Sequence, residues 1–172
     1  PDFMPTIVVL AGPNGAGKTT WINQILEERP EDFTYVNPDE FARALPADTP
    51  NRDIAAARLV LQTLDDLESQ GCDIILETTL ASRTHAIRLR RLRDAGYRIE
   101  LLYLQLPSLD VSIQRVAQRV ASGGHHIPEE ALRRRFPLSL HYRDTLYKAL
   151  AHNWQVWESG EDGMQMLDSG PL

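Results

Sequence analysis

Residues 12–19 read Gly-Pro-Asn-Gly-Ala-Gly-Lys-Thr, which fits the pattern G-x-x-x-x-G-K-[ST] of a phosphate-binding P-loop. The flanking sequence also suits this motif. Residues 6–11 form a short apolar run, as in a buried parallel strand, and residues 18–29 have the composition of a helix. Glycines let the backbone turn tightly, so that successive N–H groups point toward one anion at the helix N-terminus. The stretch therefore predicts a strand, a glycine turn and a helix that together bind a nucleotide triphosphate.

The positions within this loop have specific expected contacts. Lys18 is expected to reach the β- and γ-phosphates, and the hydroxyl of Thr19 is expected to bind Mg²⁺. The other residues expected around the nucleotide are Gly12, Asn14, Gly15, Ala16, Gly17, Thr20 and, from a later helix, Arg115. ATP and Mg²⁺ are therefore the predicted cofactors. The alternative is an ordinary glycine turn before a helix, which the matching flanks disfavour.

The bulk composition is that of a soluble globular protein. The chain has 172 residues, of which 42% are hydrophobic and 24% are charged, so one domain with a substantial core is the simplest expectation. No apolar run approaches the roughly 20 residues that span a bilayer. Cys72 is the only cysteine, which excludes an intrachain disulfide. With no signal peptide visible, we expect a cytoplasmic protein without a membrane partner.

Positive charge is concentrated in one segment. Residues 83–143 contain 12 arginines, no lysine and 5 acidic residues, a local charge of +7, whereas the rest of the chain carries −13. Arginine suits forked contacts to phosphate, but the acidic remainder makes a nucleic-acid-coating surface unlikely and favours a compact polyanion such as a nucleotide. The alternative is that many arginines are solvated on helix faces, which we expect for Arg88, Arg90, Arg91, Arg93 and Arg98.

Strands and helices alternate along the chain. Strands are expected over residues 6–11, 33–37, 73–78, 98–106 and 154–158, with a short edge strand at 164–167. Helices are expected over residues 18–29, 41–45, 53–70, 84–95, 108–121 and 128–152, the last bent at Pro137. This alternation predicts a three-layer α/β fold like that of P-loop kinases. We expect a mostly parallel five-stranded sheet in the order 2-3-1-4-5, helices on both faces, and one domain over residues 1–172.

Candidate side chains follow the carboxyl ends of three strands, where open α/β sheets bind their ligands. They are the P-loop, Asp39 after the second strand, and residues 77–79 (Glu-Thr-Thr) at the end of the third. A small chain with a P-loop and a following aspartate suggests a metabolite kinase. Asp39 would then accept the proton of the acceptor hydroxyl. The alternative is an aspartate that only stabilises the turn after Asn37 and Pro38.

A helical lid is predicted over about residues 112–136. Arg115 and Arg119 are four residues apart and share a helix face, Gly123 and Gly124 supply a flexible break, and residues 133–135 are three arginines. Closure would bring arginines to the transferring phosphate and exclude water. The alternative is a helical hairpin with solvated arginines. The two histidines after the break, without a nearby third ligand, make a poor zinc site.

The ordered set of motifs resembles the zeta-toxin family of P-loop kinases, in particular its short stand-alone members. The matching stretches are residues 11–20, residues 37–39 (Asn-Pro-Asp), residues 77–80 (Glu-Thr-Thr-Leu), and the region from Arg115 to Arg135. The resemblance implies an ATP-dependent kinase acting on the sugar 3′-hydroxyl of UDP-N-acetylglucosamine. It also implies an inhibitory antitoxin for many members. Two departures concern the acceptor: larger members have longer chains, and their lid carries its second arginine in a different local string.

The resemblance also implies roles for individual residues. Lys18 would bind phosphate and Asp39 would act as the general base, while lid arginines, for which we select Arg119 and Arg134, would contact the γ-phosphate. Glu77 and Thr79 would hold the acceptor, and we place Arg83 on the acceptor side as well. Two other functions stay open: a nucleic-acid end kinase and a non-catalytic ATP-binding switch. The acceptor, a cognate antitoxin, toxicity, the oligomeric state and the choice among residues 133–135 are left open by the sequence.

Overall fold

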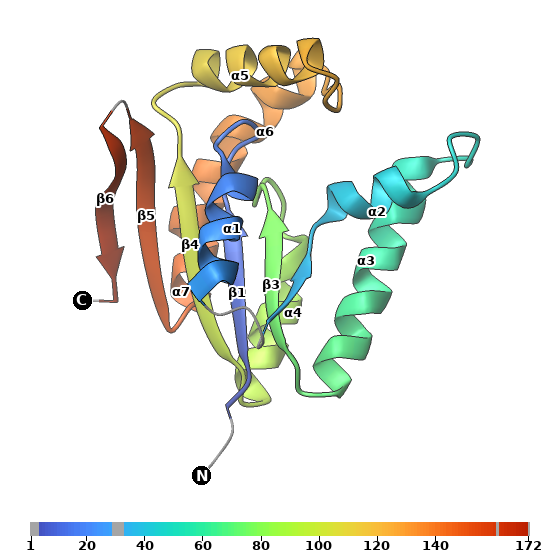
Figure 1. The fold of residues 1–172 in the computed structure, drawn as a ribbon. Helices are drawn as coiled ribbons and strands as arrows, with labels where there is room; N and C mark the ends of the chain where they lie inside the picture. Colours follow the sequence, from blue (N-terminus) through green and yellow to red (C-terminus); the bar gives the residue numbers. More distant parts are fainter. Residues whose placement is uncertain (1–3, 29–32, 161, 172) are drawn as a thin grey trace.

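The computed structural model describes residues 4–28, 33–160 and 162–171. Within them, six strands form one sheet in the order β2-β3-β1-β4-β5-β6 (Figure 1). The strands are β1 (Thr6–Ala11), β2 (Phe33–Val36), β3 (Asp73–Thr78), β4 (Arg98–Gln105), β5 (Asn153–Gly160) and β6 (Gly163–Gly170). The first five are parallel, and β6 pairs antiparallel with β5. The α/β fold and the order of the first five strands are confirmed.

The edge strand β6 is the main difference from the expected sheet. We expected a short strand at residues 164–167 beside a five-stranded sheet, whereas β6 is a full sixth strand that pairs with β5 from Trp154 to Gly160. Almost all of its residues are exposed, so its sequence lacks the apolar alternation that marks a half-buried strand. The length of β6 is set by main-chain pairing with β5. Local sequence patterns do not predict such pairing.

The helices agree with the prediction to within a few residues, except near the C-terminal end. They are α1 (Lys18–Glu28), α2 (Pro38–Ala44), α3 (Arg52–Ser69), α4 (Thr84–Asp94), α5 (Leu109–Ala121), α6 (Glu129–Tyr142) and α7 (Lys148–Leu150). A π-helical turn, η1 (Arg143–Tyr147), interrupts the helix expected to reach residue 152. The expected end of the first helix at residue 29 lies outside the described residues.

The two faces of the sheet bury different layers. Val8 and Leu10 of β1 pack against Ile22 of α1 on one face. Ile7 and Val9 point the other way, into a larger core that includes residues of α3, α4 and α7. This alternation follows from the period of two along a strand, because successive side chains point to opposite faces. The resulting arrangement has the three layers that the sequence predicted.

Capping residues start two helices at the edge of the sheet where the strands end. Asn37 caps α2, and its side-chain Oδ1 accepts a hydrogen bond from the backbone N–H of Asp39 at 3.1 Å. Ser108 caps α5, as expected, and accepts from the N–H of Val111 at 3.3 Å. Both α5 and α6 extend above this edge in Figure 1. None of the helices in the described ranges has the length and apolar character needed to cross a membrane.

The core packing of α3 yields a stability prediction. Leu64 is fully buried in the larger core, whereas Leu59, on the same helix, is 38% exposed. We expect Leu64→Ala to lower the free energy of unfolding by about 2–5 kcal/mol, because it removes buried apolar surface and leaves a cavity. Leu59→Ala should cost under about 1 kcal/mol. Urea denaturation followed by circular dichroism measures both, and equal losses would contradict the assigned core.

Candidate active site

The P-loop is held in close contact with β4 and α5. Gly12 has φ +150°, and a Cβ added there would lie 2.3 Å from the carbonyl oxygen of Leu104. At Gly15, with φ +84°, a Cβ would lie 3.1 Å from Cβ of Arg115. The hydroxyl of Ser112 donates to the carbonyl of Asn14 at 2.6 Å. Glycine is therefore required at these two positions, and α5 is bonded directly to the loop.

Lys18 is a buried cation at the start of α1. Its side chain is 7% exposed, and its Nζ donates to the carbonyl oxygen of Gly12 at 2.6 Å and, at 3.5 Å, to that of Thr78. Burial lowers the pKa of Lys18 to about 8, against the opposing effect of the Glu77 and Asp39 carboxylates, which favour the charged form. Its proton is therefore held less tightly than that of an ordinary lysine.

Two adjoining cavities meet at this lysine. The first, which we call the P-loop cavity, has a volume of about 370 Å³ and is lined by residues 14–19 of the loop together with Arg119, Gly124 and His125. The second, which we call the strand-end cavity, has a volume of about 390 Å³ and is lined by residues 77–79, Ser82, Arg134 and Arg135. Both cavities are also lined by Asn14, Lys18, Asn37, Asp39 and Glu77. The shared residues place a cation between two carboxylates at the boundary.

Asp39 reaches this boundary from the first turn of α2. Pro38 occupies the first helical position, where its missing N–H costs nothing, and Asn37 is 5% exposed and caps the helix. The carboxylate is exposed and lines both cavities. Asp39 therefore both occupies a turn position and borders the space next to Lys18.

Glu77 enters the site from the end of β3 and has a partner that the sequence analysis missed. It is 7% exposed, and its carboxylate accepts a hydrogen bond from the hydroxyl of Tyr35 on β2. Burial, and next this bond, raises the pKa of Tyr35 well above its ordinary value, so the phenol stays a donor. In the parallel β2–β3 register Tyr35 lies opposite Ile75, which puts its side chain diagonally beside Glu77 on the same face. Strand pairing was the missing information.

The arginines of the predicted site divide into three groups. Arg119 lines the P-loop cavity, and Arg134 and Arg135 line the strand-end cavity. Arg135 also donates to the side-chain oxygen of Asn14 at 3.5 Å. Three of them lie outside both cavities. Arg133 pairs with Glu129 at 3.3 Å, the guanidinium of Arg83 lies 5.7 Å from the ring centre of Tyr142, and Arg115 lines a separate cavity.

A further cavity of about 330 Å³ lies on the other side of the P-loop. Its walls come from Thr20, Trp21 and Gln24 of the first helix, Leu104, Arg115, and the β5–β6 hairpin through Ser159 and Met164. Arg115 also donates to the carbonyl oxygen of Gly15 at 3.3 Å. Trp21 contacts Trp157 edge-to-face with ring centres 5.9 Å apart. This cavity adjoins the loop on the side opposite Asp39 and has both flat apolar and polar walls.

Several lining residues were not among the selected site residues. Asn37 belongs to the Asn-Pro-Asp stretch that carries the resemblance, but the sequence assigned it no contact in the site. Ser82 and His125 face cavities because of how their loops fold, which the sequence does not report. Arg135, one of three arginines left undecided, has a site contact that Arg133 lacks.

Comparisons with known proteins find similar sequences and similar folds. An uncharacterized protein of Haemophilus influenzae is 25% identical over 132 residues, covering 75% of this chain and 91% of that protein. Among solved structures, a complex of AvrRxo1-ORF1 with AvrRxo1-ORF2 and ATP has a TM-score of 0.76 at 21% identity; it covers 96% of this chain but only 58% of the matched chain.

Two further structures are similar in fold. A structure of the PezAT chromosomal toxin–antitoxin system of Streptococcus pneumoniae gives a TM-score of 0.70 at 17% identity, covering 98% of this chain and 72% of that one. The Pnkp1/Rnl/Hen1 RNA repair complex gives 0.66 at 20% identity, covering 85% and 47%. At these identities the likeness establishes a P-loop kinase-like fold.

A family model described as an AAA domain, AAA_33, matches residues 7–135. The match begins in β1 and ends in α6, and it includes the P-loop, Asp39, Glu77 and the arginines of both cavities. Since it spans most of the chain, this protein belongs to the AAA_33 family of AAA domains.

Proposed function

We propose that this protein is an ATP-dependent kinase that transfers the γ-phosphate of ATP to a hydroxyl group of a small molecule. The observation that carries the proposal is the junction of the two cavities, where Lys18 lies between a glycine loop suited to phosphates and the carboxylates of Asp39 and Glu77. Phosphoryl transfer needs this juxtaposition, because the donor phosphate and the acceptor hydroxyl must meet in line.

On the donor side, the P-loop amides and Lys18 would bind the triphosphate. The cavity between Trp21, Arg115 and Met164 would take the nucleoside, since it adjoins the loop on the side away from Asp39 and offers a flat apolar surface. Mg²⁺ would be held by the exposed Thr19 hydroxyl and by the phosphates, with Asp39 and Glu77 near enough to fit the oxygen ligands that this ion prefers. When bound, the ion would neutralise charge on the phosphates.

On the acceptor side, the hydroxyl substrate would occupy the strand-end cavity. Asp39 would accept the hydroxyl proton while the hydroxyl oxygen forms a bond to the γ-phosphorus and the bond to the β–γ bridging oxygen breaks, releasing ADP. Thr79 and Ser82 supply hydroxyls for orienting a polar acceptor, and Glu77 can accept hydrogen bonds from it. A nucleotide sugar such as UDP-N-acetylglucosamine is the first acceptor to test, given the resemblance to zeta toxins.

We propose that residues 112–136 act as a lid on a single kinase domain. Arg119 on α5 and Arg134 on α6 belong to the two halves of this segment and line the two cavities. Gly123, with φ +90°, lies in the turn that joins them. Closure over bound substrates would bring both guanidinium groups toward the γ-phosphate and would keep water from taking it.

The structural neighbours support two extensions of the proposal. Two of them are complexes described as AvrRxo1-ORF1:ORF2 and the PezAT toxin–antitoxin system, which favours a protein antitoxin as a partner. The likeness to the Pnkp1/Rnl/Hen1 RNA repair complex favours, as second candidate, an RNA end kinase. An end kinase must bind oligonucleotides with strong salt dependence through phosphate contacts.

A coupled assay for ADP release distinguishes these functions. The purified protein is incubated with ATP and Mg²⁺, alone, with UDP-N-acetylglucosamine and other nucleotide sugars, with a small-metabolite extract, and with 5′-hydroxyl and 3′-hydroxyl oligonucleotides. Acceptor-dependent ADP release with a small molecule, and a product heavier by one phosphate in mass spectrometry, is the expected result. Turnover only with oligonucleotides would favour the end kinase, and ATP binding without turnover under any condition would favour a non-catalytic switch.

The proposed base gives the first functional prediction. Asp39→Asn should lower kcat at least about 100-fold, since a general base typically contributes 10²–10⁴ in rate. The affinity for ATP should stay within about threefold, because the P-loop and Lys18 are unchanged. Glu40→Gln, on the next residue of the same helix turn, is the matched control and should keep nearly full activity. Retained turnover in Asp39→Asn would remove Asp39 from the mechanism.

The lid arginines give a second prediction. Arg119→Ala should lower kcat by about 10³, the lower end of what an arginine on the transferring phosphate contributes. Arg133→Ala should change kcat less than about twofold, because an exposed salt bridge such as that with Glu129 contributes little. Steady-state kinetics of the two variants measure these changes in kcat, and circular dichroism confirms that both variants are folded. Equal activities would assign Arg119 to the solvated surface.

The lowered pKa of Lys18 predicts pH-dependent ATP binding. The free protein carries a charged Lys18 below its pKa of about 8 and loses the charge above it. A bound triphosphate favours the charged form, so binding should take up a proton at pH 8.5 but almost none at pH 6.5, and affinity should fall as the pH rises through 8. Calorimetry with a non-hydrolysable ATP analogue in buffers of different ionisation enthalpy measures the uptake. Lys148→Met should keep it, and Lys18→Met should abolish it.

A further inference from the structure

We propose that Ser139 and Tyr103 are positioning residues for the acceptor side of the site, an inference that rests on the kinase function proposed above. Neither residue is among those that line the P-loop cavity or the strand-end cavity. Together they connect the loop after β3, which carries Thr79, to α6, which carries Arg134 and Arg135. The pair would hold the acceptor-binding backbone against the part of α6 that follows the proposed lid.

The contact consists of two consecutive hydrogen bonds. The hydroxyl of Ser139 donates to the carbonyl oxygen of Thr79 at 2.6 Å and lies 2.7 Å from the hydroxyl of Tyr103. A carbonyl oxygen only accepts, so the proton of Ser139 is used for Thr79, and Tyr103 must be the donor to Ser139. Ser139 is 1% exposed and Tyr103 is fully buried. Burial raises the pKa of Tyr103, which keeps it a donor.

The loop that Ser139 holds has an unfavourable backbone conformation. Leu80, directly after Thr79, has φ +58°, a left-handed backbone conformation that residues other than glycine rarely adopt. Its N–H donates to the hydroxyl of Thr78 at 3.1 Å, and its side chain is 1% exposed. Such a conformation persists only when surrounding contacts impose it. The hydrogen bond from Ser139 to the carbonyl of Thr79 is a contact that can hold Leu80 in this conformation. The same loop continues to Ser82, which lines the strand-end cavity.

The same serine attaches the loop to α6 one turn after the arginines of that helix. Arg135 is four residues before Ser139 and therefore shares its helix face. Pro137, between them, has no N–H to bond to the preceding turn, so the helix is weakened at that point. On the far side of Pro137, Ser139 is the first residue of α6 whose side chain bonds to another element. Its hydrogen bond thus fixes the carbonyl of Thr79 against the part of α6 that follows Pro137.

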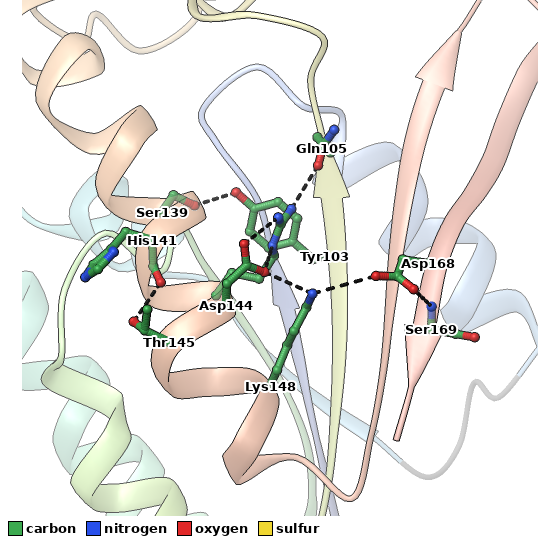
Figure 2. Close-up of polar contacts among 10 residues, drawn as sticks. Tyr103, Gln105, Ser139, His141, Asp144, Thr145, Lys148, Asp168 and Ser169 are labelled. Carbon is green, nitrogen blue, oxygen red and sulfur yellow. Dashed lines mark hydrogen bonds and ion pairs between the residues drawn. The ribbon is translucent and has the colours of Figure 1, made fainter. Parts of the chain in front are cut away.

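A network of polar contacts holds the other end of α6 in place, as Figure 2 shows. Arg143 lies 4.8 Å from the ring centre of Tyr103 and donates to the side chain of Gln105 at 2.8 Å. It also bonds to Asp144, and this bond lowers the pKa of that carboxyl. Lys148 lies 2.9 Å from Asp144 and 3.9 Å from Asp168 on β6. The helix after Pro137 is therefore attached to β4 and β6. Ser139 in turn attaches the loop after β3 to this helix through its bond to Thr79.

The test combines a kinetic measurement with one that needs no acceptor. In Ser139→Ala, the amides of residues 79–82 should exchange hydrogen about tenfold faster, because a buried hydrogen bond that restrains them is lost. The KM for UDP-N-acetylglucosamine should rise about tenfold with kcat changed less, and the Kd of a non-hydrolysable ATP analogue should stay within about twofold. Tyr103→Phe should raise the exchange rates and the KM by smaller factors. The free-energy change in the double variant should be smaller than the sum of the two single changes, because both hydroxyls belong to one chain of hydrogen bonds.

Thr145→Ala is the matched control. Its hydroxyl also donates to a backbone carbonyl, that of His141 at 2.7 Å, but it lies in η1 and does not contact Thr79. It should leave the exchange rates and both substrate constants unchanged. Unaltered exchange of residues 79–82 in Ser139→Ala, or a uniform increase across the chain with weaker ATP binding, would overturn the positioning role. If the wild-type protein does not phosphorylate UDP-N-acetylglucosamine, the acceptor class fails, and the exchange and ATP measurements still decide the role of Ser139.

Discussion

A buried ammonium group at the start of α1 is the constraint on which the site depends. Lys18 is almost completely removed from water, and such a cation is tolerated only with oxygen partners. Two backbone carbonyls, of Gly12 and Thr78, accept its hydrogen bonds, and the carboxylates of Asp39 and Glu77 favour its charge. Gly12 belongs to the loop itself, Thr78 and Glu77 to the end of β3, and Asp39 to the first turn of α2, which follows β2. The order of β1, β2 and β3 in the sheet therefore decides which charged side chains lie near Lys18.

The order of the sheet explains why these groups meet. Parallel strands end at the same edge, and β1 lies between β3 and β4, so the P-loop is flanked by the loop after β3 on one side and by the start of α5 on the other. The carboxylates come from the first side and the arginines of α5 from the second. The proposed phosphoryl transfer would use this arrangement, because cations near a transferring phosphoryl group stabilise its negative charge.

The C-terminal part of the chain, although far from the P-loop in the sequence, supports the elements around it. The strands β5 and β6 enlarge the sheet, and their hairpin forms one wall of the cavity beside Trp21. The contacts of Arg143 and Lys148 attach the end of α6 and its π-helical turn to β4 and β6. Because α6 carries the arginines of the strand-end cavity and continues through Ser139, it links the edge of the sheet to that cavity.

Much of the local structure follows from short-range sequence signals. The P-loop pattern, the apolar runs of the parallel strands and the caps at Asn37 and Ser108 depend on residues within a few positions of one another. The α/β fold class and the approximate positions of its helices and parallel strands were therefore predictable. The family match agrees with this, since it spans the same elements.

Other features depend on contacts between residues far apart in the chain. The full length of β6 comes from pairing with β5, and the bond of Tyr35 to Glu77 comes from the β2–β3 register. The choice of Arg135 over Arg133 as the one that contacts Asn14, and the contact of Ser139 with Thr79, arise from the packing of α6 on the sheet. Local propensity and motif spacing therefore determined the fold and the position of the phosphate loop. Only the folded chain decided which side chains face the cavities, because burial and hydrogen bonding between distant segments select them.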